Sequence, residues 1–241
     1  MEAITYYHCE ELEIIHLQDH PMTYREHNHT STHAVGLVMN GQITLIIDGR
    51  PTIYPAGSYF IIPPFQVHAL VLPEFYDLIS LCVNWNQLCS HERDGLHNVL
   101  RKMLRQIPTC VNDNLLDAAI AALYDSVANS QVNSVKLPDT SMIWNSLEQD
   151  CSLNVMANST GYSVSHYIKR FKKDVGLTPH RYLLQSKIRQ SQRLIENGSS
   201  IADTATLLGF YDQSHFIKCF RSIVGLTPIK YKDSVRQLQI G

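Results

Sequence analysis

The chain of 241 residues lacks the features of a membrane or secreted protein. No apolar run approaches the roughly 18 residues that a membrane-spanning helix needs. The first residues, MEAITYYHCEELEIIH, are acidic and contain neither the basic start nor the apolar stretch of a signal peptide. We therefore expect a soluble protein of the cytoplasm.

Cysteine pairs and familiar catalytic motifs are also missing. The six cysteines are scattered and form no Cys-x-x-Cys pair. This pattern argues against a disulfide framework or a thiolate zinc site and favours free thiols in a reducing compartment. Neither a glycine-rich phosphate loop nor a nucleophile motif occurs, so nucleotide-binding and hydrolase classes are not indicated.

Charged residues make up only 17% of the chain, and they are unevenly distributed. Residues 1–140 hold seven Lys and Arg against fifteen Asp and Glu, a net charge of −8. Residues 141–241 hold thirteen against seven, a net charge of +6. A basic C-terminal part favours a polyanionic partner, with chance surface charge as the alternative, and the acidic part must serve another purpose.

The pattern of apolar residues changes near residue 86. Before it, short β-branched and aromatic runs alternate with turns such as Asn40-Gly41 and Asp48-Gly49, which is typical of a β-sandwich or barrel. After it, apolar residues recur at helical spacing. The sequence predicts an α+β chain with a barrel at 1–90, a helical pair at 91–128, a linker at 129–140 and an all-α region at 141–235.

One motif occurs twice in the basic part. Ser165 to Pro179 reads SHYIKRFKKDVGLTP and Ser214 to Pro228 reads SHFIKCFRSIVGLTP, with ten of fifteen positions identical. In each copy apolar residues at every fourth position predict the buried stripe of a helix, and a glycine follows it. A shorter helix and a glycine precede each copy. The stripes are Tyr167, Phe171 and Val175, then Phe216, Phe220 and Val224.

A helix, a glycine turn and a second helix with a basic outer face form the pattern of a helix-turn-helix motif, whose second helix fits the major groove of DNA. The helix expected between the copies has about 17 residues and a length of roughly 26 Å. This is comparable to one DNA turn of about 34 Å, so one chain could read two successive groove segments. Lys172, Lys173 and Arg221 suit phosphate groups, and Gln213 suits adenine.

The segment IADTATLLGFYDQSHFIKCFRSIVGLTPIKY resembles the signature of the AraC/XylS family of bacterial transcription regulators. The matching elements include Gly209-Phe210, the run Asp212–Phe216 and the ending Gly225–Pro228. The resemblance covers about residues 141–235. It implies a seven-helix domain that binds double-stranded DNA, contacts RNA polymerase and acts as an activator.

In that family the exposed residues at the start of each recognition helix contact bases. Two alternatives stay open: the histidines of these helices contact DNA or pack against a neighbouring helix, and the isoleucines contact thymine methyl groups or belong to the core. With the basic residues on the same faces, the expected DNA-binding set is Val164, Ser165, His166, Ile168, Lys169, Lys172, Asp212, Gln213, Ser214, His215, Ile217, Lys218 and Arg221.

The acidic part contains closely spaced histidines. The stretch YREHNHTSTHAVGLVMNGQ holds His27, His29 and His33, and His68 follows in IIPPFQVHAL. Residues 27 and 29 share one face of a strand because side chains alternate, and residue 33 has the same parity. Four neutral imidazoles would suit Zn, Ni, Co or Cu rather than Mg or Ca.

This histidine pattern, with Pro55-Ala-Gly57 inside it, resembles the cupin barrel over residues 20–85. A cupin in front of a double helix-turn-helix is an architecture of the same regulator family, in which the barrel senses an effector. The resemblance implies a metal site formed by His27, His29, His33 and His68. The alternative is an organic effector among these histidines and Tyr24, Arg25, Tyr59 and Phe60.

Two further alternatives concern the whole chain. Metal cupins include dioxygenases and isomerases, so a metal-dependent enzyme that carries a DNA-binding domain is conceivable. A duplicated DNA reader fused to a barrel favours sensing over turnover, and we predict a regulator rather than an enzyme. The helical pair would either cap the barrel or join two chains, and the family resemblance favours a homodimer.

Overall fold

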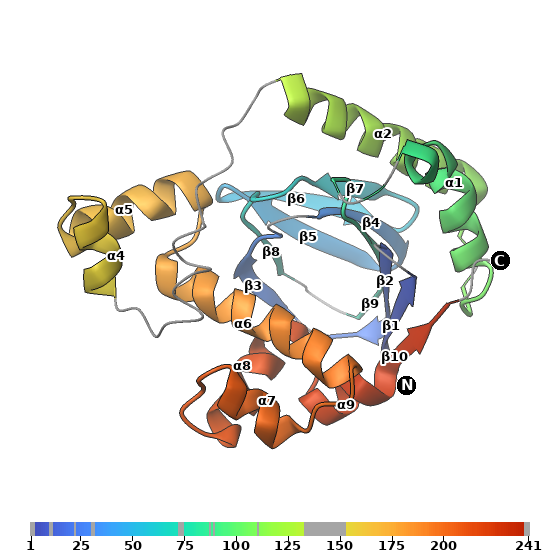
Figure 1. Ribbon diagram of the computed structural model, residues 1–241. Helices are drawn as coiled ribbons and strands as arrows, with labels where there is room; N and C mark the ends of the chain where they lie inside the picture. Colours follow the sequence, from blue (N-terminus) through green and yellow to red (C-terminus); the bar gives the residue numbers. More distant parts are fainter. Residues whose placement is uncertain are drawn as a thin grey trace. The chain divides into compact units, whose positions relative to one another are not determined.

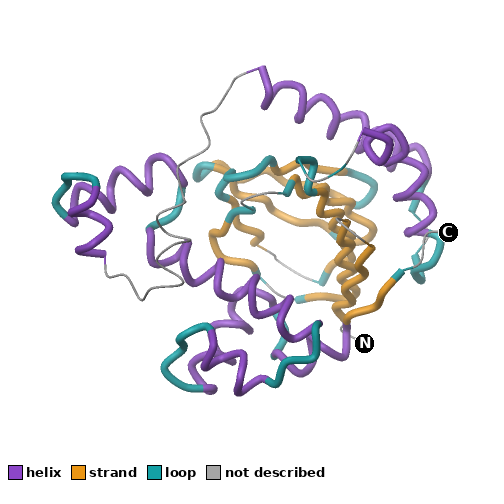
Figure 2. The backbone as a smooth tube through the Cα atoms, in the orientation of Figure 1, coloured by secondary structure: helices purple, strands orange, loops and turns teal. Residues whose placement is uncertain are grey.

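The computed structural model describes residues 3–9, 12–21, 23–29, 32–71, 75–86, 88, 90–109, 111–132 and 153–238. The chain forms two compact units: Met1–Val135 with Ser234–Gly241, and Lys136–Asp233. Figures 1 and 2 show that strands dominate the first unit and helices the second, which confirms the predicted fold class. Within the described ranges, no helix is long and apolar enough to cross a membrane.

The first unit contains two sheets, a six-stranded one in the order β10-β1-β2-β9-β4-β7 and a four-stranded one in the order β3-β8-β5-β6. The strands are β1 (Ala3–Cys9), β2 (Leu12–His20), β3 (Tyr24–His27), β4 (His33–Asn40), β5 (Gln42–Ile47), β6 (Arg50–Pro55), β7 (Tyr59–Ile62), β8 (His68–Val71), β9 (Tyr76–Val83) and β10 (Val235–Gln237).

The predicted turns lie where the strands reverse. Asp48 and Gly49 join β5 to β6 with φ angles of 50° and 75°. Two positive φ angles in a two-residue loop define the hairpin turn that matches the twist of the strands. In β4, Gly36 has no room for a side chain, because a Cβ there would lie 2.0 Å from the Phe60 ring.

Two helices, α1 (Ser90–Leu104) and α2 (Asp113–Val132), cover one face of the six-stranded sheet (Figure 1). Alternate strand residues such as Leu37 and Leu81 share a fully buried cluster with helical residues such as Met103 and Leu123. This face explains the helical spacing of apolar residues in the sequence. Residues 129–132, expected in the linker, belong to α2, and residues 133–140 of that linker lie outside the described residues.

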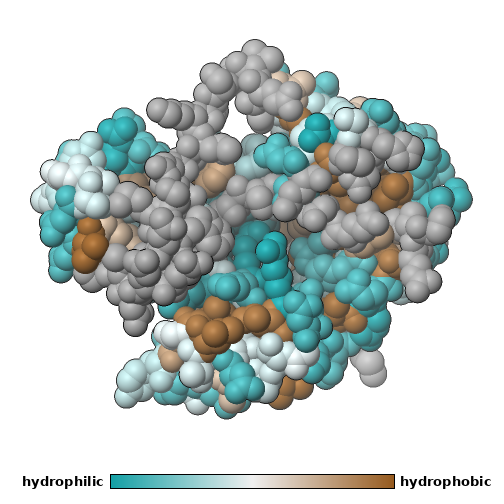
Figure 3. Space-filling view, in the orientation of Figure 1, coloured by the Kyte–Doolittle hydropathy of each residue, from teal (hydrophilic) through white to brown (hydrophobic). Residues whose placement is uncertain are grey.

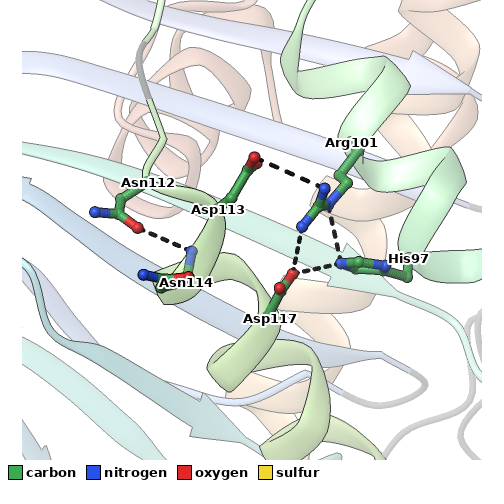
Figure 4. A network of polar contacts seen from close by, with 6 residues as sticks. All are labelled: His97, Arg101, Asn112, Asp113, Asn114 and Asp117. Carbon is green, nitrogen blue, oxygen red and sulfur yellow. Dashed lines mark hydrogen bonds and ion pairs between the residues drawn. The ribbon is translucent and has the colours of Figure 1, made fainter.

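A polar network ties α1 to α2 at the surface (Figure 4). The Arg101 guanidinium donates to Asp117 Oδ1 at 2.8 Å and lies 3.7 Å from Asp113, and His97 Nε2 lies 2.6 Å from the same Asp117 oxygen. Hydrogen bonds from Arg101 and His97 hold the pKa of Asp117 below its usual value. The network joins the two helices at their exposed surface.

The second unit is built around one long helix. Tyr182, Ile188 and Ile195 of α6 are fully buried, and their helix separates two similar pairs of shorter helices. Aromatic rings join the pairs to it: Phe171 lies 5.7 Å from Tyr182, and the Tyr231 hydroxyl donates to Glu196. The helices are α4 (Leu153–Ser159), α5 (Val164–Val175), α6 (Pro179–Glu196), α7 (Ile201–Leu207), α8 (Gln213–Val224) and α9 (Pro228–Ser234).

Candidate functional site

The first recognition helix is α5, and its ends are fixed by local interactions. Ser163 is the N-cap, and its side chain accepts a hydrogen bond from the His166 N–H at 3.4 Å. Gly176 ends the helix with a φ of 86°. The predicted stripe is buried, and the opposite face is open. Of the expected DNA-binding residues, Ser165, His166, Lys169 and Lys172 are exposed, and Val164 and Ile168 are half-buried.

The second recognition helix, α8, repeats this design with a different cap. The Asp212 carboxylate accepts a hydrogen bond from the His215 N–H at 2.6 Å, and Gly225 ends the helix with a φ of 87°. The carboxylate therefore has a structural partner in its own helix. The remaining expected residues of this copy are Gln213, Ser214, His215, Lys218 and Arg221, which are exposed, and Ile217, which is half-buried.

Both recognition helices place a histidine beside an aromatic ring of the preceding turn. The ring centroids of Tyr162 and His166 are 4.4 Å apart, and those of Phe210 and His215 are 5.8 Å apart. Both histidines nevertheless remain exposed. The two alternatives left open by the sequence are thus compatible, because a ring can pack on one side and face solvent on the other.

Three of the four predicted metal ligands lie together. The candidate ligand atoms of His27, His29 and His68 are all within 4.8 Å of one another. His27 and His68 face each other across the antiparallel pair of β3 and β8, and their ring centroids are 4.1 Å apart. Among the described residues this is the one group of three or more His, Cys, Asp or Glu side chains with such spacing.

Backbone carbonyls set the protonation pattern of two of these rings. His27 Nδ1 lies 2.8 Å from the Arg25 carbonyl, and His68 Nδ1 lies 3.0 Å from the Gln66 carbonyl. A carbonyl can only accept, so each Nδ1 carries a proton, and in the neutral form of each ring the lone pair is then on Nε2. A metal-ligating histidine is commonly oriented in this way by its second nitrogen. These residues therefore fit a metal with nitrogen ligands.

His33 does not join this group. It lies on β4 of the six-stranded sheet, with the parity of Val35 and Leu37, which face the helices. Its ring is buried, burial lowers its pKa, and neither nitrogen has a hydrogen-bond partner within the described residues. Counting parity from His27 to His33 was wrong because β3 and β4 belong to different sheets.

The four residues expected around an organic effector are also divided by the fold. Tyr24 lies beside His27, with ring centroids 6.4 Å apart, and Phe60 contacts Tyr54 of the opposite sheet. The Arg25 side chain is exposed, because an irregularity in β3 between Tyr24 and His27 leaves it outside. Tyr59 points to the other side of β7 from Phe60 and packs against the helical cluster.

Two residues that the sequence analysis did not single out adjoin Tyr24. Its hydroxyl lies 3.2 Å from His20 Nε2, and the His20 ring lies 5.7 Å from the Tyr76 ring. The Tyr76 hydroxyl is buried without a hydrogen-bond partner among the described residues. Burial raises the pKa of both tyrosines, so both hydroxyls keep their protons. His20 turns inward after Asp19, whose φ of 49° interrupts the alternation of β2.

The surface carries few large apolar side chains. Figure 3 shows a mainly hydrophilic face, with hydrophobic patches that include one over the C-terminal helices. In the described part of the second unit, the exposed large apolar residues are Val155, Leu207, Tyr211 and Ile229. Tyr211, 92% exposed, directly precedes the cap of α8 and so stands at the edge of the candidate DNA-binding surface.

Comparisons with known proteins agree with both halves. A helix-turn-helix domain family matches residues 156–234, and a cupin domain family matches residues 14–82. Over 65 residues the chain is 38% identical to the uncharacterized HTH-type transcriptional regulator YbfI of Bacillus subtilis. That match covers 27% of this chain and 24% of YbfI, so the chain spans about a quarter of the length of this curated relative.

Solved structures share the complete fold. An apo variant of ToxT from Vibrio cholerae superposes with a TM-score of 0.58 at 12% identity, covering 94% of this chain and 98% of ToxT. ToxT with a bound unsaturated fatty acid gives 0.57 at 14% identity over 96% of each chain. At these identities the likeness shows the fold alone. Together with the repeated motif, the two domain matches support a transcription regulator of the AraC type, with a cupin domain in front of its helix-turn-helix motifs.

Proposed function

We propose that this chain is a sequence-specific DNA-binding transcription regulator, controlled by a transition metal or a small molecule in its N-terminal barrel. The observation that carries the proposal is the repeated recognition helix. Two copies present capped helices with buried stripes and polar outer faces, and the helix α6, which has one buried face, connects them. A polar helix face of this kind, used twice, suits two successive segments of major groove.

The side chains on these helices would have different tasks at the DNA. Lys169 and Lys172 of α5, and Lys218 and Arg221 of α8, would contact phosphates and so orient the unit. Gln213, exposed at the first position of α8, offers an amide that can pair with adenine in the major groove. The target would be chromosomal DNA in the cytoplasm, with RNA polymerase as the partner through which the protein activates transcription.

In the barrel, His27, His29 and His68 would hold a metal ion. Neutral imidazoles favour Zn, Ni, Co or Cu. Three protein ligands leave coordination positions open, where the metal could bind an oxygen or nitrogen group of an effector. The supporting observations are the mutual proximity of the three rings and the two carbonyl contacts that orient the rings of His27 and His68.

The barrel also contains side chains that could bind a small-molecule effector. The buried Tyr76 hydroxyl has no acceptor in the described residues, so a ligand with an oxygen acceptor would satisfy it. Tyr24 would offer a second hydroxyl, and Phe60 an apolar surface. ToxT, which shares the fold, binds an unsaturated fatty acid, and small-molecule control is proposed here as well. An effector can shift the equilibrium between two arrangements of the chain only if it binds them with different affinities.

The proposed regulator is a homodimer joined through α1 and α2. Their inner faces are buried against the sheet, while Tyr124 of α2 is 37% exposed. A dimer would double the DNA contact. The presence of the histidine group and a duplicated helix-turn-helix motif in one chain favours sensing over catalysis.

The metal site is tested by elemental mass spectrometry of protein purified without a polyhistidine tag. We expect about one equivalent of a transition metal per chain, lost in the H29A/H68A double variant. The H180A variant is the matched control, because His180 is an exposed histidine on α6, outside the histidine group. Metal absent from the unsubstituted protein even after reloading, or retained by the double variant, would exclude this site.

DNA binding is tested by selection from a random-sequence duplex library with the full-length protein. We expect enriched sequences with two conserved segments about 10–11 base pairs apart, one for each recognition helix. Enrichment without a common sequence would exclude sequence-specific recognition. Repeating the selection with and without zinc separates a defect in sensing from a defect in DNA recognition.

A further inference from the structure

The last described residues add a strand to the sheet of the first unit. β10 runs parallel to β1 and pairs with its residues 6–8. The Leu238 N–H continues the ladder by donating to the His8 carbonyl at 2.9 Å. β1 would otherwise be the edge of the sheet, with one row of unpaired N–H and C=O groups. The C-terminal segment covers that edge.

Among the described residues of this segment, Val235 and Leu238 are the half-buried apolar ones. Leu238 is half-buried and packs against the hydrophobic cluster that includes Tyr7 and Leu12. Arg236 and Gln237 are exposed. A backbone ladder combined with a side-chain anchor is the manner in which an extended peptide binds a sheet edge. The C-terminal segment thus has the form of a peptide ligand that belongs to the same chain.

The two chain connections between the units differ in length. Residues 133–152 separate the end of α2 from the start of α4. At the second connection α9 ends at Ser234 and β10 begins at Val235, with no residue between them. The unit boundary lies at this junction, between Asp233 and Ser234. Along the chain, the helical unit is therefore followed directly, without a linker, by a strand of the first unit.

We propose that residues 235–238 are an intramolecular ligand of the β1 edge, and that their docking and release switch the DNA-binding unit between two states. In one state the unit is anchored at both ends. In the other it is attached only through residues 133–152. A ladder of three residues with two half-buried apolar side chains opens far more readily than the buried strands beside it, so release does not require unfolding of the barrel. The inference does not depend on a metal or an effector.

The first test offers the segment as a separate molecule. A fluorescent peptide of residues 232–241 is titrated into a chain that ends at Ser234, and binding is followed by fluorescence anisotropy. We expect saturable binding that is at least about tenfold weaker for an L238D peptide, because the substitution would bury a charge. A Q237D peptide adds the same charge at an exposed position and should bind like the original. In the full-length protein, β10 already occupies the edge of β1. The full-length protein should therefore bind the peptide at least about tenfold more weakly than the chain that ends at Ser234.

The second test uses the full-length protein and does not require the shortened chain to fold. Hydrogen exchange should be faster for residues 235–238 than for β9 in the same sheet. The L238D variant should have a larger radius of gyration by small-angle X-ray scattering than the Q237D variant, with unchanged thermal unfolding of the barrel. Equal exchange in β10 and β9, equal radii for the two variants, or equal binding of the two substituted peptides would refute the proposal.

Discussion

The two helix-turn-helix copies share an interior and differ on their surfaces. In each copy three apolar residues are buried at the same spacing, a polar side chain caps the recognition helix, and a glycine with a φ near 87° ends it. The outer faces have diverged. The comparison shows that the buried stripe and the caps specify the motif. The outer residues can differ between the copies, so each copy can make different contacts with DNA.

The division follows from which side chains each copy exposes. The first recognition helix carries Lys169, Arg170, Lys172 and Lys173, although Arg170 is paired with Asp174 at 2.8 Å. The second carries only two basic residues but begins with Gln213, where the first has Val164. We therefore expect the first copy to supply more phosphate contacts and the second to supply more base discrimination. Four experiments test this contrast, beginning with the interior that both copies share.

The largest effect should come from removing a shared core ring. F220A should destabilise the helical unit by about 3–5 kcal/mol, because Phe220 is fully buried between Phe216 and Tyr231. F171A should cost less, because Phe171 keeps 7% exposure. Urea unfolding of both variants, followed by circular dichroism, measures the difference. An equal loss would show that the two interiors are energetically equivalent.

The next largest effect should be on sequence preference. Q213A should cost about 1–3 kcal/mol at one base pair of the selected site and little elsewhere. V164A, at the same helical position of the first copy, should change discrimination less. Affinities for single-base variants of the selected site measure both. If Q213A weakened all sequences equally, base reading by Gln213 would be excluded.

The two caps should contribute similar stability through different chemistry. S163A and D212A should each cost about 0.5–2 kcal/mol, because each leaves a helix N–H without its acceptor. D212N should restore most of the loss in the second copy, since asparagine also caps helices. Thermal unfolding gives the stabilities. A D212N variant that is stable but altered in base preference would show that the carboxylate also reads DNA.

The smallest effects should appear in the salt dependence of binding. K172A and R221A should each reduce the slope of log K against log salt by about one, and should weaken binding to all sequences alike. R170A should change the slope less, because the Arg170 charge is already paired. Titrations of a random-sequence duplex at several salt concentrations measure these slopes. A larger effect for R170A would show that its ion pair opens on DNA.

The sequence predicted the recognition helices well because their determinants are local. The cap at Ser163, the stripe through Phe171 and the glycine at 176 all lie within one helix and its ends. The histidine site was predicted only in part. His27 and His29 alternate along one short segment, but His33 was misplaced because its strand belongs to the other sheet.

The remaining differences arise from irregular or distant pairing. The irregularity after Tyr24 leaves Arg25 outside, and the positive φ at Asp19 brings His20 inside. Neither irregularity changes the amino-acid composition of its strand. The alternation of apolar and polar residues therefore cannot reveal either of them. β10 was not predicted either, because it pairs with residues at the opposite end of the chain.

The connecting helix α6 imposes an angular constraint on the evolution of this unit. One inserted residue would rotate one motif by about 100° relative to the other and displace it by about 1.5 Å. An insertion of about one full turn would restore the angle but lengthen the helix by about 5.4 Å. Relatives whose connecting helix differs in length should therefore differ by near-whole turns, and the phasing of their operators along the double helix should change with it.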